Sequence, residues 1–279
     1  MSKLEIAYLG PKGTFAYELA RKRYGHVEHT MVSQETINDV FAYVTKRSSR
    51  IGVVPIDNSS GGTVYPTVDA LLNESEQLEI QEEISIDVRL ALLGRRGEKI
   101  DNIYTHFAPI KHCQKWLQKY YPSAQVIETG STAIAAREAS KIRNAAAIAN
   151  RVCAGIYNMD ILRHPIPIRM KNMTHFFVIA RHHTQRLQKI SKTSLAVRLK
   201  NRTGSLYEFL RPMADAKINL SRIISRPIEG KPREFAFLID VDENIHKHKL
   251  SNALKEAARH AQRIKVLGSY PCFRMYHLG

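Results

Sequence analysis

The stretch from Gly52 to Leu72 reads GVVPIDNSSGGTVYPTVDALL, an apolar segment followed by small polar residues and glycines before a helical pattern. Its first residues are β-branched or small, which predicts a buried strand. Gly61 and Gly62 allow backbone N–H groups to approach a ligand closely, and Asn58 and its polar neighbours supply neutral hydrogen-bond donors. The stretch therefore predicts a pocket for the oxygens of an anion. The alternative is a strand–turn–helix connection whose polar residues only cap the helix.

Strands alternate with helices on both sides of this stretch, a rhythm typical of an open α/β sheet. The predicted strands lie at 4–9, 51–56, 78–93, 102–105, 124–127, 145–149 and 172–180. The predicted helices lie at 36–47, 64–74, 109–120, 131–140 and 151–157, with a further one starting near Ala16.

The pattern changes after a polar segment at residues 182–193, which has no clear periodicity and predicts a linker. Strands are expected beyond it at 194–200, 218–225, 234–241 and 264–270, with helices at 204–215 and 246–262. This βαββαβ order predicts a ferredoxin-like unit.

A chain of 279 residues suits two or three compact units. No apolar run approaches the roughly 20 residues of a membrane-spanning helix, and the sequence goes directly into a strand without the pattern of a secretory signal. Cys113, Cys153 and Cys272 are far apart and odd in number, which indicates reduced thiols. We therefore expect a cytoplasmic protein without a membrane partner.

The net charge of +16 raises the question of an anionic partner. The basic residues are scattered in twos and threes without a DNA-binding motif, which argues against nucleic acid. The histidines lack a metal-ligand spacing, so no metal is expected. Gly10-Pro11-Lys12-Gly13-Thr14 lacks the order of a phosphate loop, and no cofactor is expected either.

Several further motifs occur together along the chain. They are Gly10-Pro11-Lys12-Gly13-Thr14-Phe15, Val54-Pro55-Ile56-Asp57-Asn58-Ser59, Gly130-Ser131-Thr132-Ala133, Asn172-Met173-Thr174-His175-Phe176, Arg202-Thr203-Gly204-Ser205-Leu206 and Ser225-Arg226-Pro227. Together and in this order they resemble a prephenate dehydratase with a C-terminal regulatory ACT domain.

The resemblance implies a fold and a division of the chain. It implies a two-lobed catalytic domain like the type II periplasmic-binding-protein fold, over residues 1–181, with substrate held between the lobes. Lobe one is expected at 1–75 and 165–181, and lobe two at 76–164. The linker 182–193 then leads to the ACT domain at 194–279.

The resemblance also implies a reaction, the conversion of prephenate to phenylpyruvate, water and carbon dioxide in phenylalanine biosynthesis. It places Thr174 beside the leaving hydroxyl, with His175 as a second catalytic residue. The expected substrate-binding residues are Thr14, Asn58, Ser59, Gly62, Ser131, Thr132, Ala133 and Phe176. The family's Thr-Arg-Phe and Pro-Ile-Glu-Asn read here as Thr174-His175-Phe176 and Pro55-Ile56-Asp57-Asn58.

Family members bind phenylalanine at an ACT dimer interface, which implies an allosteric effector and a homodimer or dimer of dimers. The corresponding residues here are Asn201, Gly204, Ser205, Leu206, Ser225, Arg226 and Pro227, with Ser205 and Ile224 replacing the family's alanine and glutamate. An ACT domain that only dimerises is the alternative.

Two other functions remain open. One is a decarboxylase that removes carbon dioxide from prephenate but keeps the hydroxyl, which the altered neighbour of Thr174 makes worth testing. The other is a non-catalytic ligand sensor on the two-lobed fold. The retained hydroxyl residues argue against a sensor, which has no need of them.

Overall fold

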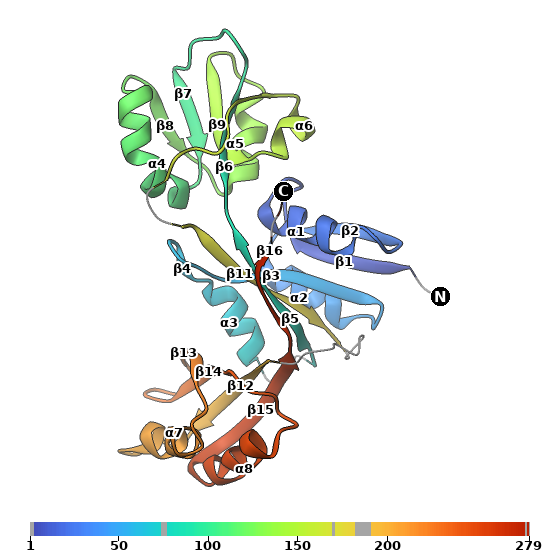
Figure 1. Ribbon diagram of the computed structural model, residues 1–279, viewed down its shortest axis with the longest axis vertical. Coiled ribbons are helices and arrows are strands. Elements are labelled where there is room, and N and C mark those ends of the chain that lie inside the picture. Colours follow the sequence, from blue (N-terminus) through green and yellow to red (C-terminus); the bar gives the residue numbers. More distant parts are fainter. Residues whose placement is uncertain (1–2, 74–76, 169–170, 182–190, 277, 279) are drawn as a thin grey trace.

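The computed structural model describes residues 3–73, 77–168, 171–181, 191–276 and 278, so most of the predicted linker lies outside the described residues. Three β-sheets with their helices lie one above another along the long axis of the molecule (Figure 1). We call the unit built on the middle sheet lobe one, the unit at the top lobe two, and the unit at the bottom the C-terminal unit. The predicted α/β fold class is confirmed.

Lobe one has a mixed sheet in the order β16-β5-β11-β3-β1-β2, with β4 paired to β3. Its strands are β1 (Leu4–Leu9), β2 (His29–Gln34), β3 (Arg50–Asn58), β4 (Gly62–Thr63), β5 (Glu79–Asp87), β11 (Met173–Ala180) and β16 (Cys272–Tyr276). Its helices are α1 (Phe15–Tyr24), α2 (Ile37–Thr45) and α3 (Tyr65–Leu72). Side-chain caps fix two of these helix starts, with Thr14 accepting from the backbone of Tyr17 and Thr36 forming a capping box with Asp39.

Lobe two has a five-stranded sheet in the order β10-β6-β9-β7-β8. Its strands are β6 (Leu90–Gly94), β7 (Asn102–Thr105), β8 (Gln125–Glu128), β9 (Ala145–Asn150) and β10 (Asp160–Arg163). Its helices are α4 (Phe107–Tyr120), α5 (Thr132–Ala139) and α6 (Cys153–Tyr157). The chain enters lobe two from β5 into β6 and returns from β10 into β11, so two crossings join the lobes.

The C-terminal unit has an antiparallel sheet in the order β13-β14-β12-β15, which confirms the predicted ferredoxin-like arrangement. Its strands are β12 (Lys192–Leu199), β13 (Leu220–Pro227), β14 (Phe235–Val241) and β15 (Ala261–Tyr270). Its helices are α7 (Ser205–Asp215) and α8 (His248–Ala257), and a short 3₁₀ turn (Ala258–His260) follows α8.

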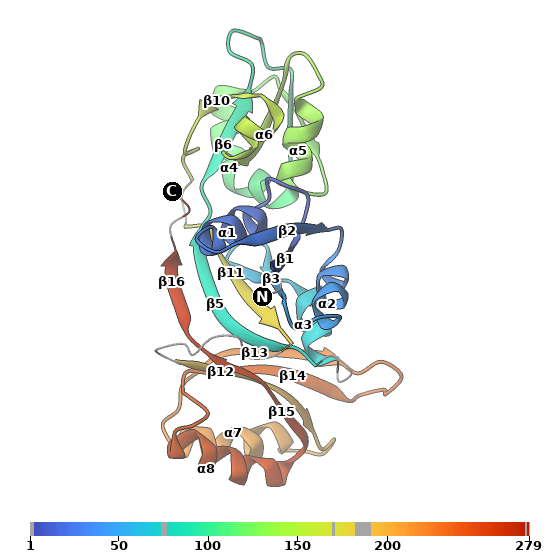
Figure 2. The same cartoon turned by 90° about the vertical axis from the view of Figure 1, so that its right-hand side faces the viewer.

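The sheet of the C-terminal unit has helices on one face only, and Figure 2 shows its other face turned toward lobe one. On that second face Leu238, Leu267 and Tyr270 share an apolar core with Ile56 and Phe177 of lobe one. Burial of this face against lobe one is the hydrophobic contribution that holds the two units together.

One glycine permits a close approach of the two backbones at this interface. A Cβ added at Gly268 on β15 would lie 2.3 Å from the carbonyl oxygen of Ile80 on β5. Any larger residue would force the two strands apart.

The sheets divide the chain differently from the expected lobe boundaries. The single strand predicted at 78–93 is two strands, because the chain leaves the ladder at Val88 and Arg89. The first of them, β5, pairs with β11 inside lobe one, although residues 76–164 were expected in lobe two. The last strand, β16, also joins lobe one, by pairing with β5, although residues 194–279 were expected as one unit. A strand pattern does not say which sheet the strand joins.

Candidate functional site

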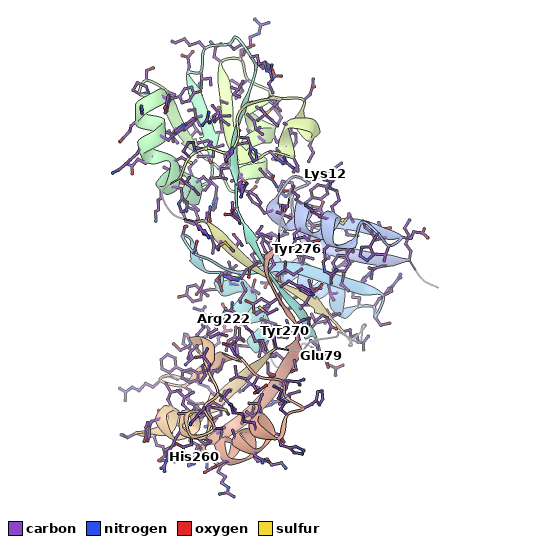
Figure 3. The ribbon with its side chains drawn as sticks, viewed as in Figure 1. Lys12, Glu79, Arg222, His260, Tyr270 and Tyr276 are labelled. Carbon is purple, nitrogen blue, oxygen red and sulfur yellow. The ribbon has the colours of Figure 1, made fainter. Side chains whose placement is uncertain are left out.

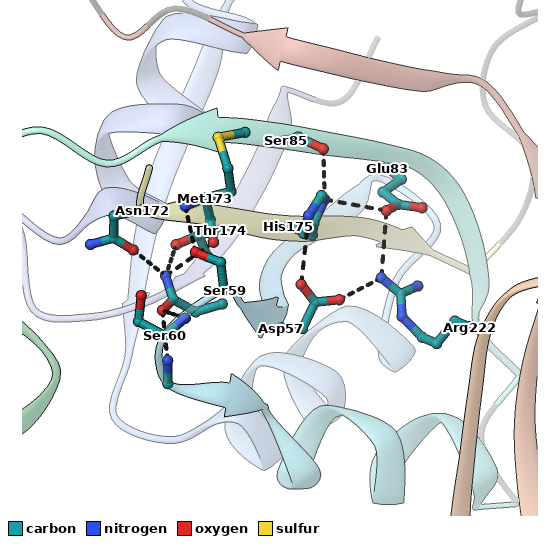
Figure 4. Close-up of polar contacts among 12 residues, drawn as sticks. Asp57, Ser59, Ser60, Glu83, Ser85, Asn172, Met173, Thr174, His175 and Arg222 are labelled. Atoms are coloured by element: carbon teal, nitrogen blue, oxygen red, sulfur yellow. Dashed lines mark hydrogen bonds and ion pairs between the residues drawn. The ribbon is translucent and has the colours of Figure 1, made fainter. Parts of the chain in front are cut away.

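Thr174 lies at the start of β11, where the chain returns from lobe two, and its side chain is largely buried. The side-chain amide of Asn58 on β3 contacts it, with Nδ2 at 2.7 Å from Oγ1 of Thr174 and 2.7 Å from Oδ1 of Asn172 (Figure 4). Ser59 fixes the same strand start, since its backbone N–H donates to the carbonyl of Met173 and its hydroxyl accepts from the N–H of Met173.

The orientation of the Asn58 amide follows from its backbone partners. Its Oδ1 accepts from the backbone N–H groups of Ser60 and Gly61, at 2.9 and 2.8 Å. Because backbone N–H groups only donate, the amide nitrogen must point the other way, toward Thr174. Asn58 is therefore the donor to Oγ1, and the hydroxyl proton of Thr174 remains available to a ligand.

Thr174 and His175 lie on opposite faces of β11, because successive side chains of a strand alternate. Thr174 shares its face with Phe176 and Val178, which pack in the core cluster that continues into lobe two. His175 shares its face with Phe177, which packs toward the C-terminal unit. The structure thus does not bring together the two expected catalytic residues.

The side chain of His175 lies in a cluster of charged groups between lobe one and the C-terminal unit. Its Nδ1 is 2.6 Å from Oγ of Ser85 and 3.5 Å from Oε1 of Glu83, and its Nε2 is 3.7 Å from Oδ1 of Asp57. Arg222 of β13 reaches the cluster from the C-terminal unit, with Nη2 at 2.6 Å from Oδ2 of Asp57.

A cavity of about 740 Å³ lies at this junction. Side chains of both units line it, including Asp57, His175 and Lys192. Between the two lobes a much smaller cavity, of about 60 Å³, is lined by residues such as Glu18, Arg89 and Arg151.

Other predicted substrate residues lie at helix N-termini that face the boundary between the lobes. Thr14 caps α1, and Ser131 caps α5 by accepting from the backbone N–H of Ile134. The two lobes touch beside these caps, because a Cβ added at Gly13 would lie 3.6 Å from Cβ of Ala133. Thr132 and Ala133 form the first turn of α5, whose N–H groups lack partners within the helix.

Two predicted substrate residues lie elsewhere. Phe176 is a core residue, only 2% exposed. Gly62 adopts a positive φ of 78° and lines the cavity beside the C-terminal unit.

The predicted effector residues occupy two places. Asn201 and Leu206 are exposed near the start of α7, and Ser205 is buried with a hydroxyl that has no partner within the described part of the chain. Gly204, which precedes α7, adopts a positive φ of 83°.

The other three effector residues, Ser225, Arg226 and Pro227, end β13. Arg226 points toward lobe one and forms a bidentate ion pair with Asp69 of α3, at 2.5 and 2.8 Å. Because residues alternate along β13, Ser225 faces the opposite way. The structure therefore brings Arg226 to lobe one rather than to the start of α7.

Sequence reasoning missed four groups of this region, Asn172, Glu83, Ser85 and Arg222. The carboxylate of Glu83 is 2% exposed in a strand that is buried from residue 80 to residue 86, and a buried charge needs a partner. Nothing in the sequence indicates that its partners are Lys192 of β12 and Arg222 of β13.

The structure adds two observations about function classes. Within residues 3–73, 77–168, 171–181, 191–276 and 278 no group of His, Cys, Asp or Glu is arranged to hold a metal ion. No helix of the described chain is long and apolar enough to cross a membrane.

The model of the prephenate dehydratase family matches residues 6–184, and that of the ACT domain matches residues 193–259. The chain belongs to the prephenate dehydratase family. By family it is a carbon–oxygen lyase with a C-terminal ACT domain, as the motifs predict. The C-terminal unit is called the ACT domain below.

A curated relative and a solved structure carry the same family name, and a further structure with the same fold is described by another activity. The chain is 37% identical over 271 residues to a bifunctional chorismate mutase/prephenate dehydratase of Aquifex aeolicus, covering 96% of this chain and 74% of the relative. It resembles the prephenate dehydratase of Arthrobacter aurescens solved in complex with L-Phe, with a TM-score of 0.85, 26% identity, and 96% and 90% of the two chains covered. A structure described as a quorum quenching acylase, GqqA, has the same TM-score and identity and covers 96% and 97%.

Proposed function

We propose that this chain converts prephenate to phenylpyruvate, carbon dioxide and water, and that Thr174 assists departure of the ring hydroxyl. The observation that carries the proposal is the fixed amide of Asn58, which donates to Oγ1 of Thr174. A hydroxyl that accepts from a fixed donor keeps its own proton for a second hydrogen bond, which this proposal assigns to the substrate. Aromatisation of the ring supplies the driving force, so the protein needs mainly to stabilise the developing hydroxide.

The carboxylates of prephenate need donors that remain unpaired in the folded chain. The first turns of α1 and α5 supply such donors, since helix N-termini carry unpaired N–H groups and a partial positive charge. We assign the two carboxylates to these turns, with the start of α1 from lobe one and Ser131, Thr132 and Ala133 from lobe two. Thr14 acts here as the cap of α1, because its own hydroxyl donates to the carbonyl of Leu9. Binding from both lobes would also exclude water from the reacting ring.

In this proposal the remaining expected residues hold the start of β11, which carries Thr174, in position. Ser59 holds Met173 in place, and Asn172, which was not among the expected residues, holds Asn58. His175 acts as a positioning residue on the opposite face, because its ring contacts Ser85, Asp57 and Glu83 rather than the Thr174 side of β11. Phe176 anchors the strand in the core.

Incubation of the purified protein with prephenate, followed by the ultraviolet absorbance of phenylpyruvate, tests the reaction. Formation of the aromatic product together with carbon dioxide supports the dehydratase. Release of carbon dioxide with a non-aromatic product that keeps the hydroxyl would identify the alternative decarboxylase. Binding of prephenate without any product would identify a sensor.

We propose in addition that phenylalanine regulates this reaction in phenylalanine biosynthesis. Support comes from the ACT domain and from the L-Phe complex of the Arthrobacter aurescens protein. The effector would lie near Gly204 and Ser205 and would contact the buried hydroxyl of Ser205, which has no partner among the described residues. A rise in the thermal midpoint with phenylalanine, lost in Gly204→Val, checks this proposal. Equal thermal midpoints with and without saturating phenylalanine would contradict the proposal.

The organisation of the protein is proposed as follows. Residues 1–181 form the catalytic unit and 194–279 the ACT unit, with β16 as the part of the ACT unit that returns to lobe one. A homodimer or dimer of dimers in the cytoplasm is proposed from the family, and sedimentation of the full chain measures the oligomeric state.

A further inference from the structure

Arg222 joins the ACT domain to lobe one through a single buried guanidinium. Its side chain is 10% exposed, and Figure 3 shows the residue at the boundary between the two units. Its Nη2 lies 2.6 Å from Oδ2 of Asp57 and 3.5 Å from Oε1 of Glu83, both in lobe one. Its Nη1 donates to Oδ2 of Asp240, on β14 of the ACT domain. The geometry of Arg222 therefore depends on both units.

The charges around Arg222 depend on one another. Asp240 is fully buried, and desolvation raises the pKa of its carboxyl while the Arg222 charge opposes that effect. Lys192 of β12 is the second cation, with Nζ 2.7 Å from Oε2 of Glu83. A buried carboxylate that loses its cation is strongly destabilised, so the cluster permits few arrangements. A shift of β13 must therefore move Asp57 or break its ion pair.

Asp57 is linked directly to the residue that holds Thr174. It precedes Asn58 in β3, and the pairing of β3 with β11 shifts register between His175 and Phe176. Beyond this bulge the end of β3 pairs with β11 on one side and with β4 on the other, and it is also held by side-chain contacts. The ion pair of Asp57 with Arg222 is one of these contacts, and the bond from Asn58 to Thr174 is the next.

The junction is also able to change shape. The cavity of about 740 Å³ borders Arg222, Asp57 and Asn58, so these side chains are not close-packed on every side. Strand β13, which carries Arg222, ends five residues later at Pro227, directly after Ser225 and Arg226. A displacement of that end of β13 would reach Arg222 through only a few residues of the same strand.

We propose that Arg222 is a positioning residue through which the ACT domain sets the place of Asp57 and Asn58, and so the hydroxyl of Thr174. The inference rests on the proposed dehydratase function, because Thr174 is the group whose position it explains. Arg222 acts on turnover more than on substrate binding, since the carboxylates are assigned to α1 and α5.

The test compares Arg222→Gln and Arg222→Lys with the matched variant Arg23→Gln. Arg23 also forms a half-buried ion pair with a buried glutamate of β5, Glu82, at 3.0 Å, but it contacts neither Asp57 nor Asn58. We expect Arg222→Gln to lower kcat about 10- to 100-fold with KM changed less than about threefold, as a small misplacement of a reacting group does. Arg222→Lys should recover part of kcat, and Arg23→Gln should keep kcat within about twofold.

A double-mutant cycle with Asp57→Asn identifies the path. If Arg222 acts through Asp57, Arg222→Gln should lower the kcat of Asp57→Asn less than about threefold. If the decreases in kcat of the two single variants multiply fully in the double variant, the path through Asp57 is overturned. An unchanged kcat in Arg222→Gln would overturn the proposal, and so would an equal decrease in kcat in Arg23→Gln. Far-ultraviolet circular dichroism at the assay temperature confirms that each variant is folded. Wild-type protein that forms no phenylpyruvate would instead overturn the proposed function.

Discussion

The two faces of β11 differ in the kind of polar group that they carry. On the face of Thr174 the contacts are made by neutral amides and hydroxyls, and Oγ1 of Thr174 accepts from the amide of Asn58. On the face of His175 the contacts are made by charges that lie close to partners of opposite sign, such as Asp57 and Arg222. One strand therefore presents an available donor on one side and a paired charge cluster on the other.

This difference shows how a strand of eight residues can serve both chemistry and structure. A neutral face suits a dianionic ligand, since it supplies donors without opposing charges that would compete for it. A charged face buried between units needs each charge to be paired, which limits the junction to few arrangements. The predictions below test this separation, beginning with the largest expected effect.

Loss of the Thr174 hydroxyl should have the largest effect. Thr174→Ala should lower kcat at least about 100-fold with KM changed less than about threefold, because the lost donor acts on the developing hydroxide. Steady-state kinetics with prephenate measure both constants. Thr174→Ser, which keeps a hydroxyl, is the control, and its kcat should fall less than about tenfold. An equal rise in KM in Thr174→Ala would mean that Thr174 serves binding instead.

A methyl group added where the ACT domain meets lobe one should lower the stability of the protein, which tests the close contact between the two units. Gly268→Ala should lower the free energy of unfolding by about 1–3 kcal/mol, because its Cβ would overlap the Ile80 carbonyl. Gly155→Ala on α6 is the control, since nothing lies within 4 Å of its added Cβ, and it should be neutral or slightly stabilising. Urea unfolding measures both. Equal midpoints for the two variants would show that β15 and β5 do not require the close approach.

A buried carboxylate between the two lobes should give the smallest effect, a dependence of stability on pH. Burial raises the pKa of Glu18 on α1, while a hydrogen bond from Asn150 of lobe two opposes this rise. A raised pKa in the folded state means that the contribution of Glu18 to stability is full below its unfolded pKa and is lost as the pH rises through the folded pKa.

Glu18→Gln removes this titration and keeps an acceptor for Asn150. The thermal midpoint of the wild type relative to this variant should fall between about pH 4 and pH 7. A difference between the two midpoints that stays constant over this range would contradict the raised pKa.

Local sequence patterns predicted most of the elements that surround the site. The apolar run before Asn58 was sufficient to place this residue at the end of a strand. The helical periodicity of α5 was sufficient to place Ser131 at the start of a helix. Four strands, β2, β4, β10 and β16, were missed, and each lies at the edge of its sheet. The half-exposed β2 and β10 lie at sheet edges, where a strand has little apolar surface to reveal it.

The candidate site was predicted less completely than the fold. Thr174 and Asn58 were predicted from motifs, and the structure joins them by a hydrogen bond. Pairing Thr174 with His175 treated neighbours in sequence as neighbours in space, whereas alternation along β11 separates them. Arg222 lies 165 residues from Asp57, and no local pattern connects positions so far apart.

The sequence alone determined the order of strands and helices, the motifs of the catalytic and ACT domains, and the polar residues at the strand ends. These features follow from local propensity and residue chemistry. Only the tertiary structure decided that β5 and β16 complete lobe one, that His175 faces the ACT domain and that Arg222 reaches Asp57. Those features depend on which surfaces pack together, and burial between distant segments is a property of the whole folded chain.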